Sequence, residues 1–366
     1  MKILVTGGGG FLGTYIVREL LKQGHNVSSV SRNEYPHLSE LGVKNLICDL
    51  TNKEDLDKLD LSSYEAVFHV AALAGVWGSY DKYYSINFEG TKNLIEKIKN
   101  QNTKYFIYTS SPSVVFGEDN IENGDESISY PTKFYTHYAK TKALAEKFVL
   151  ESNEDFFKTT ALRPHLIWGP GDPHLIPRII SKARENKLKQ VGDGENLVDI
   201  IYVENAANAH VDAFNALVAE KSVSGKAYFI GQERPVKIWQ FIDDIVALKN
   251  IKPIESMISF KKAFYIGWFL EIMFKVLGIL KPEPPMTRFV ALQLAKSHYF
   301  SHANAIRDFG FNPKKMLTRL SYTDFDGTEF FSNTKNYNSI DDDMIKKYAP
   351  NVVEGVSKLS NWAKNL

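Results

Sequence analysis

The sequence predicts an α/β fold, a Rossmann-type doubly wound parallel sheet with a smaller, mostly C-terminal second domain. Three observations predict it. Short apolar runs, each ending in a loop, alternate with segments of helical periodicity over the first half of the chain. A glycine-rich turn over residues 6–13 follows the first apolar run. Tyr138 and Lys142 stand four residues apart, a spacing that places both on one face of a helix.

The individual elements follow from local patterns. Residues 2–6 predict a buried strand, because the run is short, apolar and stopped by glycine. Residues 11–23 have apolar side chains at helical spacing, and Gly24 marks the expected end. Further strands are predicted at 26–31, 66–70 and 105–109, with a helix at 84–100. Because alternating strands and helices form parallel sheets, we expect ligands beyond the carboxyl ends of these strands.

Composition excludes several classes of protein. The 366 residues correspond to one large or two modest domains, and 44 % hydrophobic residues are enough for a core. The 44 Lys and Arg side chains nearly balance 43 Asp and Glu, so no nucleic-acid partner is expected. Cys48 is the single cysteine, which excludes a disulfide within the chain and favours a reducing, cytoplasmic compartment. We expect no signal peptide and no metal site, since neither pattern is present.

The alternation of strands and helices loosens after residue 163. Four prolines fall between residues 164 and 177, and prolines fix loop shape as substrate loops require. We therefore expect a dinucleotide-binding domain over residues 1–165, to which segments of 195–235 return. Residues 166–366 are predicted to form mainly a substrate-binding region.

Gly7, Gly10 and Gly13 follow the spacing G-x-x-G-x-x-G between the first predicted strand and helix. Glycine lets the backbone approach a pyrophosphate, while the helix N-terminus offers free N–H groups and the positive end of its dipole. Phe11 and Leu12 belong to the same turn. A glycine-rich turn without a ligand is the alternative, but the strand–turn–helix context favours a bound dinucleotide.

The second predicted strand ends in Ser31 and Arg32, where NAD-dependent enzymes often place an acid that bonds the ribose hydroxyls. A guanidinium at this position suits the 2′-phosphate of NADP. We therefore expect NADP(H) as the cofactor rather than NAD(H); an exposed loop arginine is the alternative. Asp49 is predicted either to bond the adenine amino group or to cap a turn.

Tyr138 is a candidate proton donor or acceptor, because a lysine ammonium one helical turn away favours the phenolate. Lys142 can also bond the nicotinamide ribose. Ser111 follows a predicted strand and can donate a hydrogen bond to a substrate oxygen without adding charge. Ser110 is a near-equal candidate and Ser113 a weaker one. A tyrosine and a lysine at this spacing occur on many solvated helices, but the serines and the glycine turn favour a catalytic set.

These motifs resemble the extended short-chain dehydrogenase/reductase family, over Met1 to about Pro313. The matching stretches are Thr6-Gly7-x-x-Gly10-Phe11-x-Gly13, Asp49-Leu50, His69-Val70-Ala71-Ala72, Asn87-x-x-Gly90-Thr91, Thr109-Ser110-Ser111, Tyr138-x-x-x-Lys142 and Leu162-Arg163-Pro164. The resemblance implies an NAD(P)-dependent oxidoreductase that acts on an alcohol or a carbonyl through Ser111, Tyr138 and Lys142. It also implies cofactor contacts from the matched turn, Leu50, Ala71 and Pro164.

Within this family, the chain resembles the branch of 3β-hydroxysteroid dehydrogenases and bacterial 2-alkyl-3-oxoalkanoate reductases. Three stretches favour the second group: residues 69–78 with Trp77-Gly78, residues 108–116, and residues 163–174 with His165-Leu166-Ile167-Trp168. The resemblance implies a ketoreductase of lipid metabolism, serving long-chain olefin biosynthesis, that reduces a 3-oxo acid with two long alkyl chains. A 3β-hydroxysteroid or sterol dehydrogenase, a nucleotide-sugar epimerase and a dinucleotide sensor without chemistry are the alternatives.

Residues 263–280 are mostly apolar, but Glu271 and Lys275 lie in their middle, so a membrane span is not expected. The segment is predicted to cover the mouth of an apolar substrate site, to lie in a membrane interface, or to be a core helix. Aromatic residues of the plain core are the alternative to a substrate-lining role. The candidate substrate residues are Trp77, Ser113, His165, Trp168, Trp268 and Phe269.

The expected partner is a hydrophobic small-molecule substrate. A peripheral contact with the inner membrane face, a contact with a pathway enzyme and a homodimer are further expectations that the sequence leaves open. Residues 318–351, which include Asp341-Asp342-Asp343, resemble an insertion before a terminal helix at 353–366. This insertion is predicted to be a lid, an oligomer contact or a loop.

Overall fold

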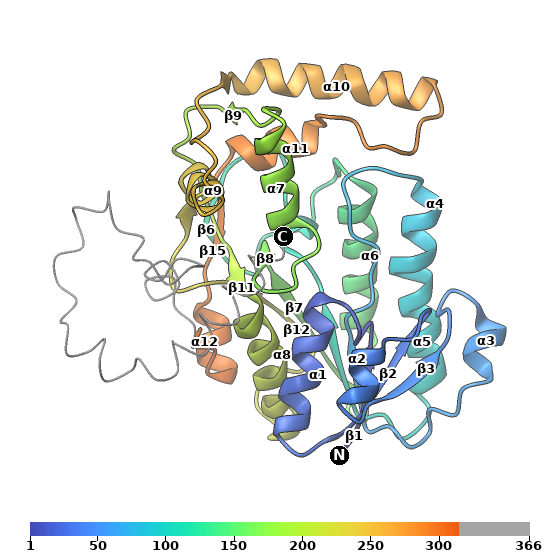
Figure 1. Cartoon of the computed structure of the whole chain (residues 1–366). Coiled ribbons are helices and arrows are strands. Elements are labelled where there is room, and N and C mark those ends of the chain that lie inside the picture. The colour runs from blue at the N-terminus through green and yellow to red at the C-terminus, as the bar shows by residue number, and fades with distance from the viewer. Residues whose placement is uncertain (315–366) are drawn as a thin grey trace, which may run out of the picture.

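A seven-stranded sheet forms the centre of the structure, a computed structural model that describes residues 1–314 (Figure 1). The strand order is β12-β7-β5-β4-β1-β2-β3, and every neighbouring pair is parallel. The predicted doubly wound parallel sheet is therefore confirmed. The strands are β1 (Lys2–Thr6), β2 (Asn26–Ser31), β3 (Lys44–Ile47), β4 (Ala66–His69), β5 (Tyr105–Thr109), β7 (Lys158–Pro164) and β12 (Lys226–Ile230).

Helices cover both faces of this sheet. Alternate side chains of β1 divide between two hydrophobic cores, with Ile3 and Val5 on one face and Leu4 on the other. The first core includes α1 and α8, and the second includes α5 and α6. The helices are α1 (Phe11–Lys22), α2 (Pro36–Glu40), α3 (Lys53–Asp57), α4 (Tyr80–Tyr83), α5 (Gly90–Ile98), α6 (His137–Glu151) and α8 (Val203–Val218).

The direction of winding reverses between β1 and β4, because β2 and β3 lie on one side of β1, and β4 and β5 on the other. Loops diverge at such a switch point and leave a crevice beyond the carboxyl ends of the strands. Thr6 and His69 end these two strands, and their side chains are joined at 2.7 Å between Oγ1 and Nδ1. Thr6 Oγ1 also accepts from the N–H groups of Val70 and Ala71, each at 3.1 Å. These bonds fix the path of the loop at the crevice.

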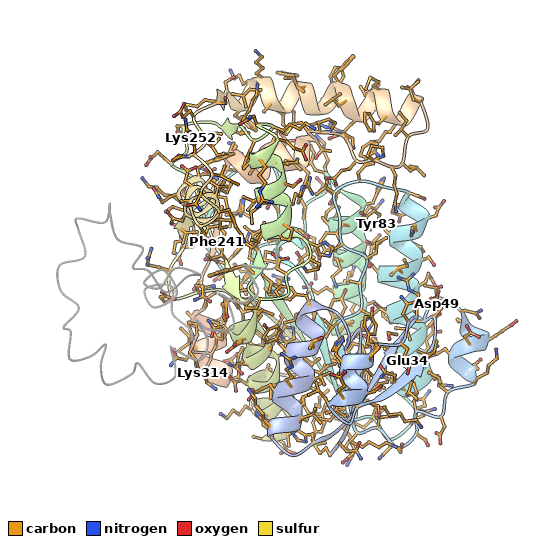
Figure 2. All side chains as sticks on the ribbon, in the orientation of Figure 1. Glu34, Asp49, Tyr83, Phe241, Lys252 and Lys314 are labelled. Atoms are coloured by element: carbon orange, nitrogen blue, oxygen red, sulfur yellow. The ribbon has the colours of Figure 1, made fainter. Side chains whose placement is uncertain are left out.

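A second region covers the carboxyl ends of the sheet. Figure 1 shows α7, α9, α10 and α11 gathered at the end of the molecule opposite the N-terminus. In Figure 2, Phe241 and Lys252 lie in this part, whereas Glu34 and Asp49 lie beside the sheet. Its elements are β6 (Ile121–Gly124), β8 (Ile167–Trp168), α7 (Leu175–Arg184), β9 (Gln190–Val191), β10 (Leu197–Val198), β11 (Ile201–Tyr202), β13 (Val236–Lys237), α9 (Ile238–Ala247), β14 (Met257–Ile258), α10 (Phe260–Val276), α11 (Arg288–Ala295) and β15 (His298–Phe300).

The helix predicted at 84–100 is more complex than expected. The chain enters it through α4, passes through the π-helical segment η1 (Tyr84–Glu89) and continues as α5. Asn87 on η1 is buried; its Oδ1 accepts from Leu73 N–H at 2.7 Å, and its Nδ2 donates to Leu73 O and Thr141 Oγ1, each at 3.1 Å. The π turn therefore places one amide between the loop after β4 and the helix α6.

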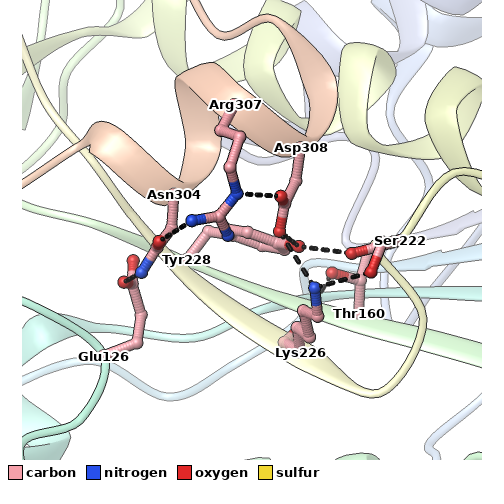
Figure 3. Close-up of polar contacts among 8 residues, drawn as sticks. All are labelled: Glu126, Thr160, Ser222, Lys226, Tyr228, Asn304, Arg307 and Asp308. Carbon is pink, nitrogen blue, oxygen red and sulfur yellow. Dashed lines mark hydrogen bonds and ion pairs between the residues drawn. The ribbon is translucent and has the colours of Figure 1, made fainter.

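The chain returns to the sheet after the second region has begun. Both α8 and β12 fall within residues 195–235, and α12 (Ala303–Phe309) packs beside them. Figure 3 shows Asp308 of α12 accepting hydrogen bonds from Lys226 at 3.1 Å, Tyr228 at 2.8 Å and Arg307 at 2.7 Å. The domain division near residue 165 stays a prediction. The segments 318–351 and 353–366 lie outside the described residues.

Candidate active site

A cavity of about 650 Å³ lies beyond the carboxyl ends of the sheet strands and extends into the second region. Four of the candidate substrate residues do not line it: Trp77, Trp168, Trp268 and Phe269. The sequence-predicted residues that it brings together are Gly7, Gly10, Phe11, Leu12, Gly13, Arg32, Asp49, Leu50, Ala71, Ser111, Ser113, Tyr138, Lys142, Pro164 and His165.

The glycine turn has no room for side chains. Gly7 has a φ of +68°, which favours glycine, and a Cβ on Gly13 would lie 2.1 Å from the carbonyl oxygen of Gly7. Gly10 precedes α1 without a side-chain cap, and no acidic residue stands in the first turn. The N–H groups and the positive dipole end of α1 therefore meet the cavity unscreened, as a pyrophosphate requires. The turn fits a dinucleotide.

Arg32, Asn33 and Tyr35 line the cavity after the end of β2. The Oγ of Ser31 donates to Asn33 O at 2.7 Å and fixes the turn that carries them. Asp49 Oδ1 accepts from the N–H of Thr51 at 3.0 Å and from its hydroxyl at 2.8 Å, as expected for a residue that caps a turn. Sequence reasoning missed Asn33 and Tyr35, because they lie in a loop without periodicity.

The start of α6 determines where Tyr138 lies. Thr136 Oγ1 accepts from Ala139 N–H at 3.0 Å and caps the helix two residues before the tyrosine. Ser111 caps the short 3₁₀ helix η2 (Pro112–Val114); its Oγ accepts from Ser113 N–H at 3.2 Å. Burial raises the pKa of Tyr138, and a hydrogen bond with Ser111 offsets part of that increase. Tyr138 is therefore a neutral phenol that can donate its proton.

Lys142 is 2 % exposed, and its Nζ donates to Thr109 O at 2.5 Å. The same Nζ lies 4.1 Å from the centre of the Tyr108 ring. Burial lowers the pKa of Lys142 from 10.5 to about 7. Burial has the largest effect on the pKa of both groups, and Lys142 Nζ is bonded to a carbonyl oxygen, so a lowered pKa of Tyr138 beside Lys142 stays a prediction. Residues one helical turn apart share a face without having to touch.

The far end of the cavity is enclosed by the second region. Its wall includes the rings of Phe116, Phe289 and Phe300, and the paired histidines His165 and His298. Sequence reasoning missed all of these except His165. Helical and strand periodicity could have indicated that residues of α11 or β15 share a face. No local pattern indicates that this face meets a cavity whose other wall lies far away in the sequence.

The predicted tryptophans have other positions. Trp77 Nε1 donates to Ile279 O at 2.9 Å, which ties the loop after β4 to the segment after α10. Trp168 on β8 is buried, and its ring packs edge-on against Tyr202 and Phe241. Trp268 and Phe269 are exposed on α10. A role of these four residues in substrate binding stays a prediction.

The fold and the site define a class of protein. A parallel Rossmann sheet whose glycine turn shares one cavity with Ser111, Tyr138 and Lys142 belongs to an NAD(P)-dependent oxidoreductase of the extended short-chain dehydrogenase/reductase type. Residues 4–261 match the model of the 3-beta hydroxysteroid dehydrogenase/isomerase family. The chain belongs to this family, and the resemblance seen in the sequence motifs is confirmed.

Three of the proteins similar to this chain differ in the activity that their names state. The chain is 42 % identical to a 2-alkyl-3-oxoalkanoate reductase of Stenotrophomonas maltophilia, over 86 % of this chain and 95 % of that protein. It is 34 % identical to the sterol-4-alpha-carboxylate 3-dehydrogenase, decarboxylating, of Mus musculus, over 85 % of this chain and 86 % of that protein. The solved UDP-glucose 4-epimerase of Thermotoga maritima has a TM-score of 0.66 at 22 % identity, over 87 % of this chain and 95 % of that one, which shows a shared fold.

Proposed function

We propose that the protein is an NADPH-dependent ketoreductase that reduces a long-chain 2-alkyl-3-oxoalkanoate to the 3-hydroxy acid. The observation that carries the proposal is the convergence of Ser111, Tyr138 and Lys142 on the cavity that the glycine turn opens into. The substrate class rests on relatives: two proteins named 2-alkyl-3-oxoalkanoate reductase are each 42 % identical to the chain. The name of the sterol relative indicates a substrate with a carboxylate on carbon 4, next to the reacting carbon 3.

Each catalytic residue has one task in this reaction. A bound NADPH supplies the hydride. Ser111 donates a hydrogen bond to the substrate carbonyl oxygen and polarises it. Tyr138 gives its phenolic proton to the same oxygen as negative charge develops there. Lys142 holds the nicotinamide ribose and, when protonated, stabilises the phenolate that remains.

Arg32 supports NADPH over NADH. Its side chain is exposed and lines the cavity just after β2. A guanidinium can clamp a 2′-phosphate with two parallel hydrogen bonds, whereas an enzyme specific for NAD more often has an acid at this strand end. The neighbouring Asn33 lines the same wall and can add a further hydrogen bond to that phosphate.

An assay of NADPH oxidation against a panel of carbonyl compounds tests the proposal. We expect turnover with 2-alkyl-3-oxoalkanoates, and none with a UDP-sugar. Turnover of a sterol 4-carboxylate with NAD⁺, together with no reduction of the acyclic acid, would replace the proposal by a sterol dehydrogenase. NAD⁺ that stays bound through purification, with interconversion of UDP-sugars, would replace it by an epimerase.

We further propose that α10 lies on the surface of an anionic membrane. Only Ala263, Gly267 and Glu271 of this helix are buried, so a narrow stripe at four-residue spacing faces the protein. Gly267 allows close packing, since a Cβ there would lie 2.6 Å from the backbone of Thr287. Glu271 accepts hydrogen bonds from Arg288 through both carboxylate oxygens. Oε2 accepts from Nε at 2.9 Å and from Nη2 at 2.6 Å, and Oε1 accepts from the backbone N–H of Arg288 at 2.7 Å. The charged residue thus faces inward.

The outer side of α10 is apolar and basic. Tyr265, Phe269 and Val276 are 65, 60 and 81 % exposed, and Figure 2 shows side chains standing outward from this helix. Exposed lysines flank them at Lys261, Lys262, Lys275 and Lys281. Within residues 1–314, no helix is both long and apolar enough to cross a bilayer. Aromatic and aliphatic side chains beside lysines suit the interface of anionic lipids, whereas two copies of this face would bring like charges together.

Sedimentation with vesicles tests this proposal. We expect binding to phosphatidylcholine–phosphatidylglycerol vesicles and at least about tenfold weaker binding of the triple variant Tyr265→Ser, Phe269→Ser, Val276→Ser. The matched control is Phe156→Ser, Ile306→Ser, because both residues are also more than half exposed but lie outside α10. Equal binding of the two variants would contradict the proposal. A dimer that only the triple variant dissociates would assign the face to a second copy of the chain.

A further inference from the structure

Two histidines form a buried pair in the substrate end of the cavity. His165, just after β7, and His298, on β15, both line the cavity, and both are nearly inaccessible to bulk solvent. His165 Nε2 lies 2.6 Å from His298 Nδ1, and His298 Nε2 lies 3.0 Å from the carbonyl oxygen of Gln293. The two rings come from segments far apart in the sequence, and the pair is not part of the Ser111, Tyr138 and Lys142 set.

The hydrogen bonds fix the tautomers of the neutral pair. A carbonyl oxygen only accepts, so His298 Nε2 carries a proton and His298 Nδ1 is an acceptor. His165 Nε2 must then donate to His298 Nδ1, which leaves His165 Nδ1 without a proton. Within residues 1–314, this Nδ1 has no hydrogen-bond partner, although His165 lies in the cavity wall. Because His165 lines the cavity and is 8 % exposed, a ligand in the cavity can supply the missing partner.

One added proton reverses the polarity of that atom. If the proton resides on His165, both ring nitrogens of His165 donate. If it resides on His298, His298 Nδ1 donates to His165 Nε2, and His165 carries its single proton on Nδ1. In both cases His165 Nδ1 carries a hydrogen and becomes a donor. The added positive charge is shared by two rings whose facing nitrogens lie 2.6 Å apart. The Gln293 carbonyl oxygen accepts from His298 Nε2 and fixes the orientation of that ring.

The surroundings of the pair disfavour its protonated form. Burial and the neighbouring His298 hold the pKa of His165 well below its usual range, and burial lowers the pKa of His298 to about 4. Of the charged groups near the pair, Asp199 raises the pKa of His298. Its Oδ2 accepts from Phe300 N–H at 2.8 Å and lies 3.4 Å from His302 Nε2, and within residues 1–314 its buried Oδ1 has no hydrogen-bond partner. A carboxylate in the cavity would act in the same direction as Asp199 and raise the pKa of the pair.

We propose that the His165–His298 pair is the carboxylate-binding subsite of the cavity: it takes up one proton when an anionic substrate binds, and His165 Nδ1–H donates to the carboxylate. This inference rests on the proposed function, because a 3-oxo acid carries its carboxylate two carbons from the ketone carbon. The balance is simple. One proton leaves solvent and joins the pair, the carboxylate stays ionised, and no other bond forms or breaks. His165 contacts the substrate, whereas His298 and Gln293 position its ring.

Calorimetry with a ligand that cannot be reduced tests the subsite. The probes are a 2-alkylalkanoic acid without a ketone and its primary amide, each bound to the enzyme with NADP⁺. For the wild type we expect the acid to bind at least about tenfold more tightly than the amide at pH 6. Because the free pair has lost its proton above about pH 4, the affinity for the acid should fall about tenfold for each pH unit from about pH 5 up to the pKa of the pair in the complex. Titrations in two buffers of different ionisation enthalpy should show uptake of about one proton for the acid and none for the amide.

Variants locate the effect on the pair. His165→Gln should abolish the preference for the acid and its pH dependence, and leave amide and NADPH binding unchanged. His298→Asn should reduce the preference by less. The matched control is His25→Gln, which replaces a histidine that does not line the cavity. It should behave as the wild type.

Two results would overturn the inference: a wild type that binds acid and amide equally without proton uptake, or a His165→Gln variant that retains the preference for the acid. The two-buffer titration of the wild type decides the matter even if the variants do not fold. Failure here is distinguishable from failure of the proposed function. An enzyme that reduces the oxo acid but shows no carboxylate preference refutes only the subsite, and one that binds the acid through His165 but reduces nothing refutes only the ketoreductase.

Discussion

Glu146 and Arg163 form a buried ion pair with two parallel hydrogen bonds, from Nε to Oε2 at 2.9 Å and from Nη2 to Oε1 at 2.6 Å. Their side chains are 0 and 4 % exposed. Glu146 lies one helical turn after Lys142 on α6, and Arg163 is the penultimate residue of β7, which leads to His165. The pair therefore joins the helix of the catalytic residues to the strand that carries the substrate wall.

Glu146→Gln should destabilise the protein by about 3–5 kcal/mol, because it leaves the buried Arg163 without its charge partner. Burial alone would raise the pKa of Glu146, but Arg163 outweighs it and holds that pKa below the ordinary 4.5. Because the pKa of Glu146 is lower in the folded than in the unfolded chain, its ionised form stabilises the fold. This stabilisation is fully present above about pH 4.5 and is lost as the pH falls through the pKa of Glu146 in the folded protein. Urea unfolding at pH 7 and pH 4 measures both effects. Glu96 provides the control, because it is exposed and pairs with Lys53 at 3.1 Å and Lys92 at 3.9 Å; Glu96→Gln should have little effect.

Lys142→Met should stabilise the cofactor-free protein while abolishing reduction. Burial lowers the pKa of Lys142 from 10.5 to about 7, so between these values the unfolded chain binds a proton that the folded chain lacks. The stability of the wild type therefore rises with pH across this window. Below pH 7 the buried Lys142 is protonated, and the full destabilisation by the buried charge is present. The advantage of the variant should be largest at pH 6 and shrink towards pH 10 in thermal melts. Lys140→Met, an exposed neighbour, should show no such trend; a pH-independent advantage for Lys142→Met would contradict the lowered pKa.

Arg32→Asp should change the cofactor preference. Loss of a guanidinium that clamps a 2′-phosphate removes about 1.5–3 kcal/mol, which corresponds to about 10- to 100-fold weaker NADPH binding. NADH should bind as well as before or better, since the new carboxylate can accept from the ribose hydroxyls. Fluorescence titration of both nucleotides measures the ratio. An unchanged ratio would show that Arg32 is an ordinary loop arginine.

Gly13→Ala should weaken NADPH binding by about tenfold or more, because its Cβ would lie 2.1 Å from the Gly7 carbonyl and force the turn away from the phosphates. Gly117→Ala is the control, since a Cβ there meets no atom within 4 Å. Equal nucleotide affinity in the two variants, measured by titration, would be evidence against the turn as the pyrophosphate site.

The sequence determined the parts of the fold that local patterns encode. The strand over residues 2–6, the glycine turn and α1 are contiguous, so composition and spacing sufficed for them. The π-helical segment around Asn87 was not predictable, because the bonds of Asn87 to the backbone of Leu73 and to the Thr141 hydroxyl of α6 depend on tertiary contacts. The bond from Lys142 to the Thr109 carbonyl was missed for the same reason. Trp168 was a candidate binding residue because of its residue type, but its packing against Tyr202 depends on the tertiary structure and could not be predicted from local sequence.

Transfer of a deuterium label from NADPH tests the central claim most directly. With NADPH deuterated at the transferred position and a 2-alkyl-3-oxoalkanoate, the wild type should give a 3-hydroxy acid that carries deuterium on carbon 3. Tyr138→Phe should lower this rate by about 10²–10⁴-fold and still bind NADPH, because only the proton donor is lost. Wild-type turnover without label in the product, or a Tyr138→Phe variant as fast as the wild type, would contradict the mechanism.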